Sequence, residues 1–246
     1  MNLKKIGIII LCSGIVGVGF GLGMKLYETI AYIQSTNSTE ESVGSVLVSD
    51  LFSPETFTSI VTQAKPKEDL KKNYENAKSA SSKTIGWIYV ENTRINYPIM
   101  HGQNNYYLNR SPDGSPSASG SIFLDENCNA FGNVNIIHGH NMLSGKMFAG
   151  LMKYWQVETF KDDNKIFIYD GNTEREFHVI SVFRTAPSIS FKFQVPTPEA
   201  TLEYAKELKA KSVYTAHEPS NKPLVILNTC FSDGTQDHLI VVGQEV

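Results

Sequence analysis

The sequence is poor in cysteine and has no excess of positive charge. Its 246 residues hold 22 lysines and arginines against 25 aspartates and glutamates, a formal net charge of −3, which argues against a nucleic-acid partner. The three cysteines, Cys12, Cys128 and Cys230, form no CxxC pair and no metal-ligand cluster, so neither a zinc site nor a dense disulfide framework is expected. A single bridge between Cys128 and Cys230 stays open. Without a glycine-rich phosphate loop or an internal repeat, no cofactor is expected either.

A long apolar run lies near the start of the sequence. After Lys4 and Lys5, residues 6–24 are apolar or glycine except for Ser13, and as a helix they would span about 28 Å, close to the hydrocarbon thickness of a bilayer. No A-x-A-like site closes the run, which favours an uncleaved anchor over a removed signal peptide. The lysines place residues 1–5 in the cytoplasm and the rest of the chain outside the cell.

The remainder divides into a stalk and a folded domain. Residues 25–50 are rich in serine, threonine and glutamate and predict a solvated extracellular stalk. The domain is expected over 51–246. It opens with a helical signal at Ser53-Pro54-Glu55, an N-cap followed by proline and an acidic first turn, and the helical pattern continues through Asp69 towards Ala80.

Short β-like runs dominate the rest of the domain, separated by glycine, asparagine, aspartate and proline. Two helical interludes interrupt them, one over Lys146–Trp155 and one from Thr197-Pro198-Glu199 to about Val213. Many short strands with a few helices predict an α+β fold, mainly β, built as a barrel or a sandwich. The expected strands are Ile85–Val90, Ile95–Met100, Ser121–Leu124, Val134–His138, Ile166–Tyr169, Glu176–Phe183, Leu224–Thr229 and Leu239–Val242.

Cys230 is the first candidate for chemistry. It ends the apolar run 224–229 and precedes the polar run 232–237, a position that favours an exposed and reactive thiol. The alternative is an inert buried cysteine, the commoner fate of a lone thiol. Cys128 follows Asp125-Glu126-Asn127, which predicts a surface loop.

Two histidines, His138 and His140, follow a predicted strand and precede a helix. A metal site would need a third ligand, which the neighbourhood lacks, and the simpler alternative is that the rings satisfy loop carbonyls. Cysteine and histidine together are the minimal pair for thiol catalysis, because imidazole can accept and return the proton.

Several motifs resemble those of one family, the sortases. Asn135–Met142 is similar to their GHN-M stretch, and Leu227–Cys230 is similar to their TLxTC strand end. The motifs fall in the family's order from Thr84 to the end of the sequence. The segments that resemble the class B members in particular are Asn104–Leu108, Gly120–Asp125, Ser144–Phe148 and the helix before the last two strands.

The resemblance implies a closed eight-stranded sortase barrel, with helices packed on it, on the outer face of a Gram-positive bacterium. It implies Cys230 as nucleophile, His140 as acid/base residue, and Asn141 and Thr229 as substrate-binding residues, with no metal or cofactor. Such enzymes cut the sorting signal of a secreted protein after threonine, hold the acyl fragment as a thioester and pass it to an amine. The acceptor is a peptidoglycan precursor or a lysine of a pilin-like subunit.

One position departs from the family pattern. Sortases carry an arginine eight to ten residues after the cysteine, and the matching residue here is His238. Histidine lacks the permanently charged fork of arginine, so either His238 does a weaker version of the same work, another residue replaces it, or the enzyme is slow. The simpler alternative is that His238 is a surface residue on an edge strand. Two other functions therefore stay open: a cysteine peptidase that only hydrolyses, and a sortase-like module that binds without turnover.

Overall fold

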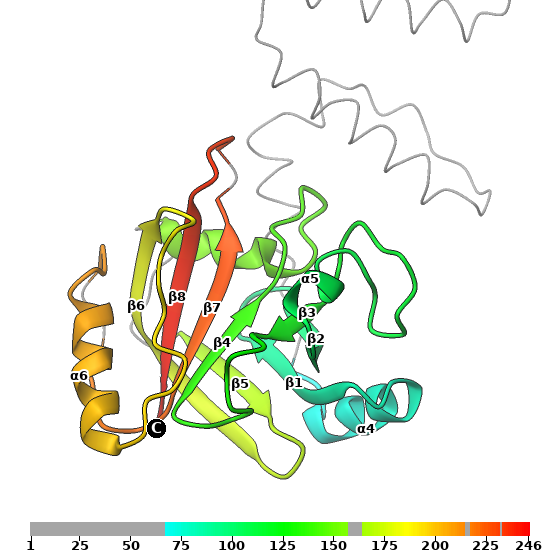
Figure 1. Cartoon of the computed structure of the whole chain (residues 1–246), viewed down its shortest axis with the longest axis horizontal. Helices are drawn as coiled ribbons and strands as arrows, with labels where there is room; N and C mark the ends of the chain where they lie inside the picture. The colour runs from blue at the N-terminus through cyan, green and yellow to red at the C-terminus, as the bar shows by residue number, and fades with distance from the viewer. Residues whose placement is uncertain (1–66, 157–163, 215–216, 232) are drawn as a thin grey trace, which may run out of the picture. The chain divides into compact units, whose positions relative to one another are not determined.

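The computed structural model describes residues 67–156, 164–214, 217–231 and 233–246. Within them, eight strands close into a barrel in the order β1-β2-β3-β4-β7-β8-β6-β5 (Figure 1). This confirms the fold class expected from the sequence. The strands are β1 (Thr84–Val90), β2 (Asn96–His101), β3 (Ile122–Leu124), β4 (Val134–His138), β5 (Lys165–Tyr169), β6 (Glu174–Thr185), β7 (Leu224–Cys230) and β8 (His238–Glu245).

All eight predicted strands are present, each within a few residues of its expected ends. Most neighbours in the barrel are antiparallel, but β2 pairs with β3 and β4 pairs with β7 in parallel. Parallel strands point their carboxyl ends to the same edge of a sheet and need a long crossover between them. The residues that follow β4 and those that end β7 therefore meet at one edge, although about 90 residues separate them in the sequence.

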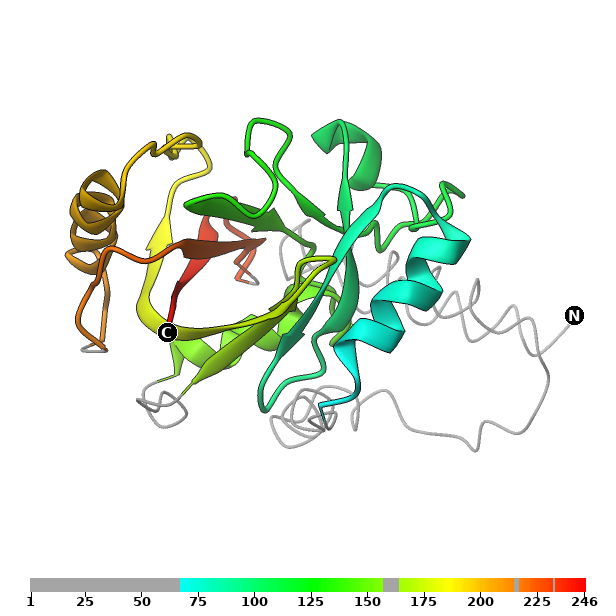
Figure 2. The ribbon, with the colours of Figure 1, turned by 90° about the horizontal axis from the view of Figure 1, so that it is seen from below.

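Helices cover the outside of the barrel on two sides (Figure 2). Helix α4 (Leu70–Ala80) begins at Asp69, whose carboxylate accepts a hydrogen bond from the Lys72 N–H at 3.0 Å. Its buried Leu70 packs with aromatic residues of β1 and β5. Helix α6 (Pro198–Lys209), the expected helix before the last two strands, begins at Thr197 as predicted.

Two shorter helices border the edge where β4 and β7 end. The predicted helix over Lys146–Trp155 is a 3-10 helix, η2 (Phe148–Trp155), and the four-residue α5 (Asn104–Tyr107) was not expected. Phe148 is fully buried and anchors η2 in the main core. Leu108, which follows α5, and Phe148, which begins η2, both contact His140 of the candidate site.

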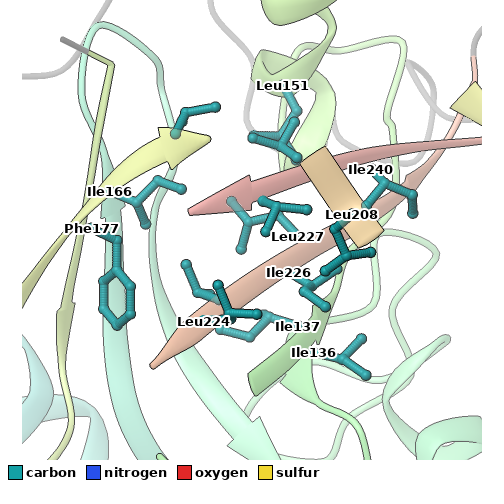
Figure 3. Packing of buried hydrophobic residues seen from close by; sticks show 14 of the residues in the cluster. Ile136, Ile137, Leu151, Ile166, Phe177, Leu208, Leu224, Ile226, Leu227 and Ile240 are labelled. Carbon is teal, nitrogen blue, oxygen red and sulfur yellow. The ribbon is translucent and has the colours of Figure 1, made fainter. Parts of the chain in front are cut away.

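Aliphatic side chains fill the barrel, and β7 lies among them over most of its length (Figure 3). Residues from Leu224 to Thr229 are all buried, and Cys230 alone is exposed. A strand covered on both faces reads as a continuous apolar run, which explains the sequence of this segment. Cys230, the candidate for chemistry, is therefore the residue at which β7 becomes exposed to solvent.

The surface position predicted for Cys128 is wrong. Cys128 is 5% exposed and belongs to the main core, where its sulfur accepts a hydrogen bond from the Ile136 N–H at 3.5 Å. The Asp125 carboxylate is used within its own turn, where it accepts from the Asn127 N–H at 2.9 Å, and the turn directs Cys128 back into the barrel. Burial raises the pKa of the Cys128 thiol to about 11. Both Cys128 and Cys230 are free thiols, so the disulfide left open by the sequence is not formed.

Several expectations concern residues outside the described ranges. The span at 6–24, the stalk at 25–50 and the helix start at Ser53 are among them. Across the described parts of residues 67–246, no helix has both the length and the apolar character needed to cross a membrane.

Candidate active site

The ends of three adjacent strands form the candidate site. In the parallel β4–β7 ladder His138 pairs with Asn228, and the Gly139 N–H extends the ladder by donating to the Asn228 carbonyl at 3.2 Å. In the antiparallel β7–β8 ladder Cys230 pairs directly with His238. Strand β4 ends at His138, and the Asn141 side-chain amide, which donates to the Cys230 carbonyl at 3.0 Å, holds the segment after β4 against the end of β7. His140, Cys230 and His238 are called the candidate row: Cys230 and His238 are paired directly, and His140 immediately precedes the residue that contacts Cys230.

Strand alternation decides which side chains share the face of Cys230. Directly paired residues lie on one face, and residues two apart in a strand return to it. Asn228, His138 and His238 therefore share the face of Cys230, whereas Thr229 points to the other side and is only 2% exposed. The structure does not bring the Thr229 side chain to the row of candidate residues.

His140 is held in an orientation that suits proton transfer. Its Nε2 lies 2.6 Å from the backbone carbonyl oxygen of Leu108. A carbonyl can only accept, so Nε2 carries the hydrogen and, in the neutral ring, Nδ1 carries the lone pair. Nδ1 has no hydrogen-bond partner within the described part of the chain and is available to accept a proton.

The segment around His140 is fixed from three sides. The Asn141 side-chain amide donates to the Cys230 carbonyl at 3.0 Å, and the Phe148 N–H donates to the His140 carbonyl at 2.8 Å. Gly139 leaves no room for a side chain, since a Cβ there would lie 2.4 Å from Ile122 Cδ1. Asn141 thus holds the segment that contains His140 against the end of β7.

His138 differs from His140 because both of its ring nitrogens are occupied. Nε2 lies 2.9 Å from the Asp125 carboxylate, and Nδ1 accepts from the Asn228 side-chain amide at 3.2 Å. Burial raises the pKa of Asp125, but hydrogen bonds from His138 and Asn127 outweigh it and bring the pKa to about 2. This chain of hydrogen bonds joins β4 to β7 and was missed at the sequence level, although Asp125 lies in the Gly120–Asp125 motif.

Cys230 is exposed, yet nearby protein atoms displace enough water from the thiol to raise its pKa above the ordinary value. No hydrogen bond to Sγ occurs among the described residues. The neutral thiol is therefore the dominant form at neutral pH, and a reaction needs a base that removes its proton during attack.

His238 lies on an interior strand of the barrel, since β8 is flanked by β7 and β6. The edge-strand interpretation is therefore wrong. The side chain is partly buried, and its Nδ1 is buried without a partner within the described ranges. Burial lowers the pKa of His238, the nearby His138 lowers it further, and Asp237 opposes both. At neutral pH the ring is neutral.

Arg184 does not replace the family arginine. It pairs with Leu239 on β8, so it shares the face opposite to Cys230 and His238. Its guanidinium donates to Asp237 at 2.6 Å and to Asp233 at 2.7 Å, and it lies 4.3 Å from the centroid of the Phe231 ring. Arg184 thus stabilises the connection between β7 and β8, and the ring of Phe231, the residue after Cys230, is the surface on which it stacks.

A metal site is not formed by the described residues, because no group of three or more histidine, cysteine, aspartate or glutamate side chains is placed to hold an ion there. An exposed free thiol paired directly with one histidine, with a second histidine in the segment held against its strand, is an arrangement suited to acyl transfer through a covalent intermediate.

The raised pKa of Cys230 predicts how its alkylation depends on pH. Iodoacetamide reacts with the thiolate and not with the thiol. The alkylation rate of Cys230 should therefore reach half of its maximum above pH 9, the ordinary pKa of a thiol, because the raised pKa means that a higher pH is needed to form the thiolate. The rate is measured by peptide mapping with mass spectrometry. Cys128 serves as the internal control and should stay unmodified in the folded protein. A midpoint for Cys230 below that of a free cysteine peptide would contradict the assignment of a resting thiol.

Comparison with known proteins agrees with this geometry. A family model described as the sortase domain matches residues 88–246. Sortase B of Listeria monocytogenes is 34% identical over 172 residues, which cover 66% of this chain and 69% of the relative. Sortase B of Staphylococcus aureus is 25% identical over 189 residues, 72% of this chain and 77% of the relative.

Solved structures give the same result. The crystal structure of Clostridium perfringens sortase B superposes with a TM-score of 0.65 at 27% identity, covering 70% of this chain and 98% of that one. A structure of Listeria monocytogenes sortase B gives a TM-score of 0.59 at 29% identity, covering 69% of this chain and 98% of that one. The matched domain, the sequence relatives and the barrel together show that the chain belongs to the sortase family, as a class B sortase.

Proposed function

We propose that this chain is a membrane-anchored extracellular transpeptidase that cleaves the sorting signal of a secreted protein after threonine. It holds the acyl fragment as a thioester on Cys230 and transfers it to an amine. The observation that carries the proposal is the direct pairing of the exposed Cys230 with His238, together with the Asn141 contact that holds the His140 segment against the end of β7. A flanking base and a flanking hydrogen-bond donor are what thiol acyl transfer requires.

In the first half of the reaction His140 acts as base and then as acid. Its Nδ1 takes the thiol proton of Cys230 as the sulfur attacks the threonine carbonyl carbon, and a C–S bond forms. The imidazolium then gives the proton to the departing amine as the C–N bond breaks. In the second half an acceptor amine attacks the thioester, and its proton passes to His140 as the N–C bond forms. The C–S bond then breaks, and His140 gives this proton to the departing sulfur, which restores the thiol of Cys230.

His238 is proposed to stabilise the negative charge that develops on the carbonyl oxygen. It shares the face of Cys230 and is its direct cross-strand neighbour. The neutral ring offers one N–H donor, which is weaker towards an anion than the charged fork of arginine. The site therefore retains a donor at the family's arginine position, at a cost in strength.

The proposed location rests on the sequence. Residues 6–24 would anchor the chain in the membrane, with residues 1–5 in the cytoplasm and the domain outside. The proposed partners are secreted proteins with a C-terminal sorting signal and an amine acceptor, either a peptidoglycan precursor or a pilin-like lysine.

Incubation with a peptide library containing threonine at the cleavage position, with and without triglycine, tests the proposal. Intact-mass spectrometry should detect a thioester on Cys230, and triglycine should convert it to a transfer product. Cys230→Ala should abolish both, and its fold should be intact because the side chain is exposed. Free acid alone would identify a peptidase, and binding without cleavage would identify a binding module.

His140 and His138 are expected to differ in their effect on turnover. His140→Ala should lower kcat by at least about 10²–10⁴-fold, the range for loss of general acid–base catalysis. His138→Ala should cost much less, because both of its nitrogens serve Asp125 and Asn228 rather than the thiol. Steady-state kinetics of the two variants decide between them. Equal losses would mean that proton transfer is not assigned to His140 alone.

His238 variants test the departure from the family. His238→Ala should lower turnover by roughly 10–1000-fold, the range for loss of one oxyanion donor, and His238→Arg should keep or raise turnover at neutral pH. The advantage of arginine should shrink as pH falls through the pKa of His238, which lies below 6.5, because the wild-type ring then gains charge. The measurement is kcat/KM of the three proteins across pH. An alanine variant equal to wild type at every pH would remove His238 from the mechanism.

A further inference from the structure

A hollow of about 320 Å³ lies in the segment between α5 and β3. It is lined by Asn109, Arg110, Pro116, Ser117 and Ala118. The Leu108 carbonyl that orients His140 is the residue immediately before this lining. The hollow therefore begins next to the group that must receive the proton of an incoming amine. Its volume is at the lower end of the range for small-ligand sites.

Arg110 gives this hollow a definite chemistry. Its guanidinium stacks on the Tyr106 ring, 4.9 Å from the centroid, and donates to the Gly114 carbonyl at 3.1 Å. One carbonyl uses one of five N–H donors, so donors remain on a guanidinium whose position is already fixed. A planar fork held in this way matches a carboxylate.

Arg110 is also not neutralised by its surroundings. Among the described residues it has no ion pair, whereas Arg175 is paired with Glu245, and Arg184 with Asp233 and Asp237. The acidic residue of its loop, Asp113, does not pair with it: the Asp113 carboxylate accepts hydrogen bonds from the Ser111 hydroxyl and from the N–H and hydroxyl of Ser115. The positive charge is thus available to a ligand.

We propose that this hollow is the binding site for the amine acceptor and that Arg110 recognises a carboxylate carried by that acceptor. The inference rests on the proposed transpeptidase activity and adds the chemical class of the second substrate, an amine with a free carboxylate a few residues away. The amine nitrogen attacks the thioester carbon, the N–C bond forms and the C–S bond breaks. The proton of the amine goes to His140, which passes it to the departing sulfur, so that Cys230 leaves as the thiol.

The test separates the two halves of the reaction. Diglycine, triglycine and tetraglycine are supplied as free acids and as carboxamides, and the KM for each acceptor is measured with one sorting peptide. Free acids should have KM values about 10–100-fold lower than the amides, the range for a hydrogen bond between charged groups. Arg110→Gln should remove this difference and leave the rate of thioester formation unchanged. Arg110→Lys should restore part of it, because the charge returns without the planar fork.

A matched control excludes a general effect of charge. Lys146 is exposed and lies in the segment between His140 and η2, so Lys146→Gln removes the same charge near the site without touching the hollow. It should keep the preference for free acids. If Arg110→Gln instead slows thioester formation, Arg110 stands in for the family's missing arginine and the acceptor proposal is wrong. Equal KM values for acids and amides in the wild type would also overturn it.

A binding measurement keeps the inference testable without turnover. Triglycine and triglycinamide are titrated into the Cys230→Ala protein, and binding is followed by NMR shifts. Triglycine should bind more tightly than its amide, and Arg110→Gln in the same background should abolish the difference. If thioester formation fails in the wild type but this difference appears, the carboxylate site stands and the proposed reaction does not. If neither acid nor amide perturbs the residues of the hollow, the site is refuted.

Discussion

The parallel pairing of β4 with β7 is the constraint on which the rest of the site depends. It sets His138 opposite Asn228 and brings the segment after β4 to the end of β7, where the Asn141 amide contacts the Cys230 carbonyl. Side chains in a strand alternate with a period of two, so a slip of one residue would turn Cys230 into the barrel and bring Thr229 to the surface. Pairing of β7 with β8 then fixes His238 on the other side of the sulfur. Two registers, rather than any direct contact among the three side chains, assemble the proposed catalytic row.

Polar contacts hold these registers at an edge where the apolar core ends. The Asp125–His138–Asn228 chain joins β4 to β7, and the Asn141 amide reaches the Cys230 carbonyl. Arg184 closes the other side by holding the β7–β8 connection through Asp233 and Asp237. The hydrogen bonds of the Asp125 carboxylate and of the Arg184 guanidinium involve charged groups and are stronger than neutral ones, and the directionality of all these contacts fixes orientation as well as position. The core supplies the stability of the barrel, whereas these polar contacts supply the geometry of its reactive edge.

Much of the fold could be predicted from local pattern. Apolar runs bounded by turn residues gave all eight strands, and Thr197-Pro198-Glu199 gave the start of α6, because caps and turns are encoded by adjacent residues. The pairing of β4 with β7 could not be found in this way, since it joins residues about 90 positions apart. For the same reason the sequence did not reveal the Asp125–His138 pair. The polar residues Asp125-Glu126-Asn127 correctly indicate a turn, but they do not determine the direction of the Cys128 side chain, which is why its surface position was predicted wrongly. The role of Phe231 became clear only with Arg184 above it.

The central claim, that both imidazoles lie beside the sulfur of Cys230, is tested most directly by placing a charge on that sulfur. Carboxymethylation of Cys230 with iodoacetate adds a carboxylate at Sγ, and a charge placed within about 4–6 Å of an imidazole perturbs that ring. NMR spectra recorded before and after modification should show shifted ring signals for His140 and His238. The ring signals of His178, which pairs with Lys165 and Gln244 elsewhere on the barrel, should be unchanged. Shifts at both histidines with none at His178 are the predicted result, and unchanged ring signals of His140 would contradict the account.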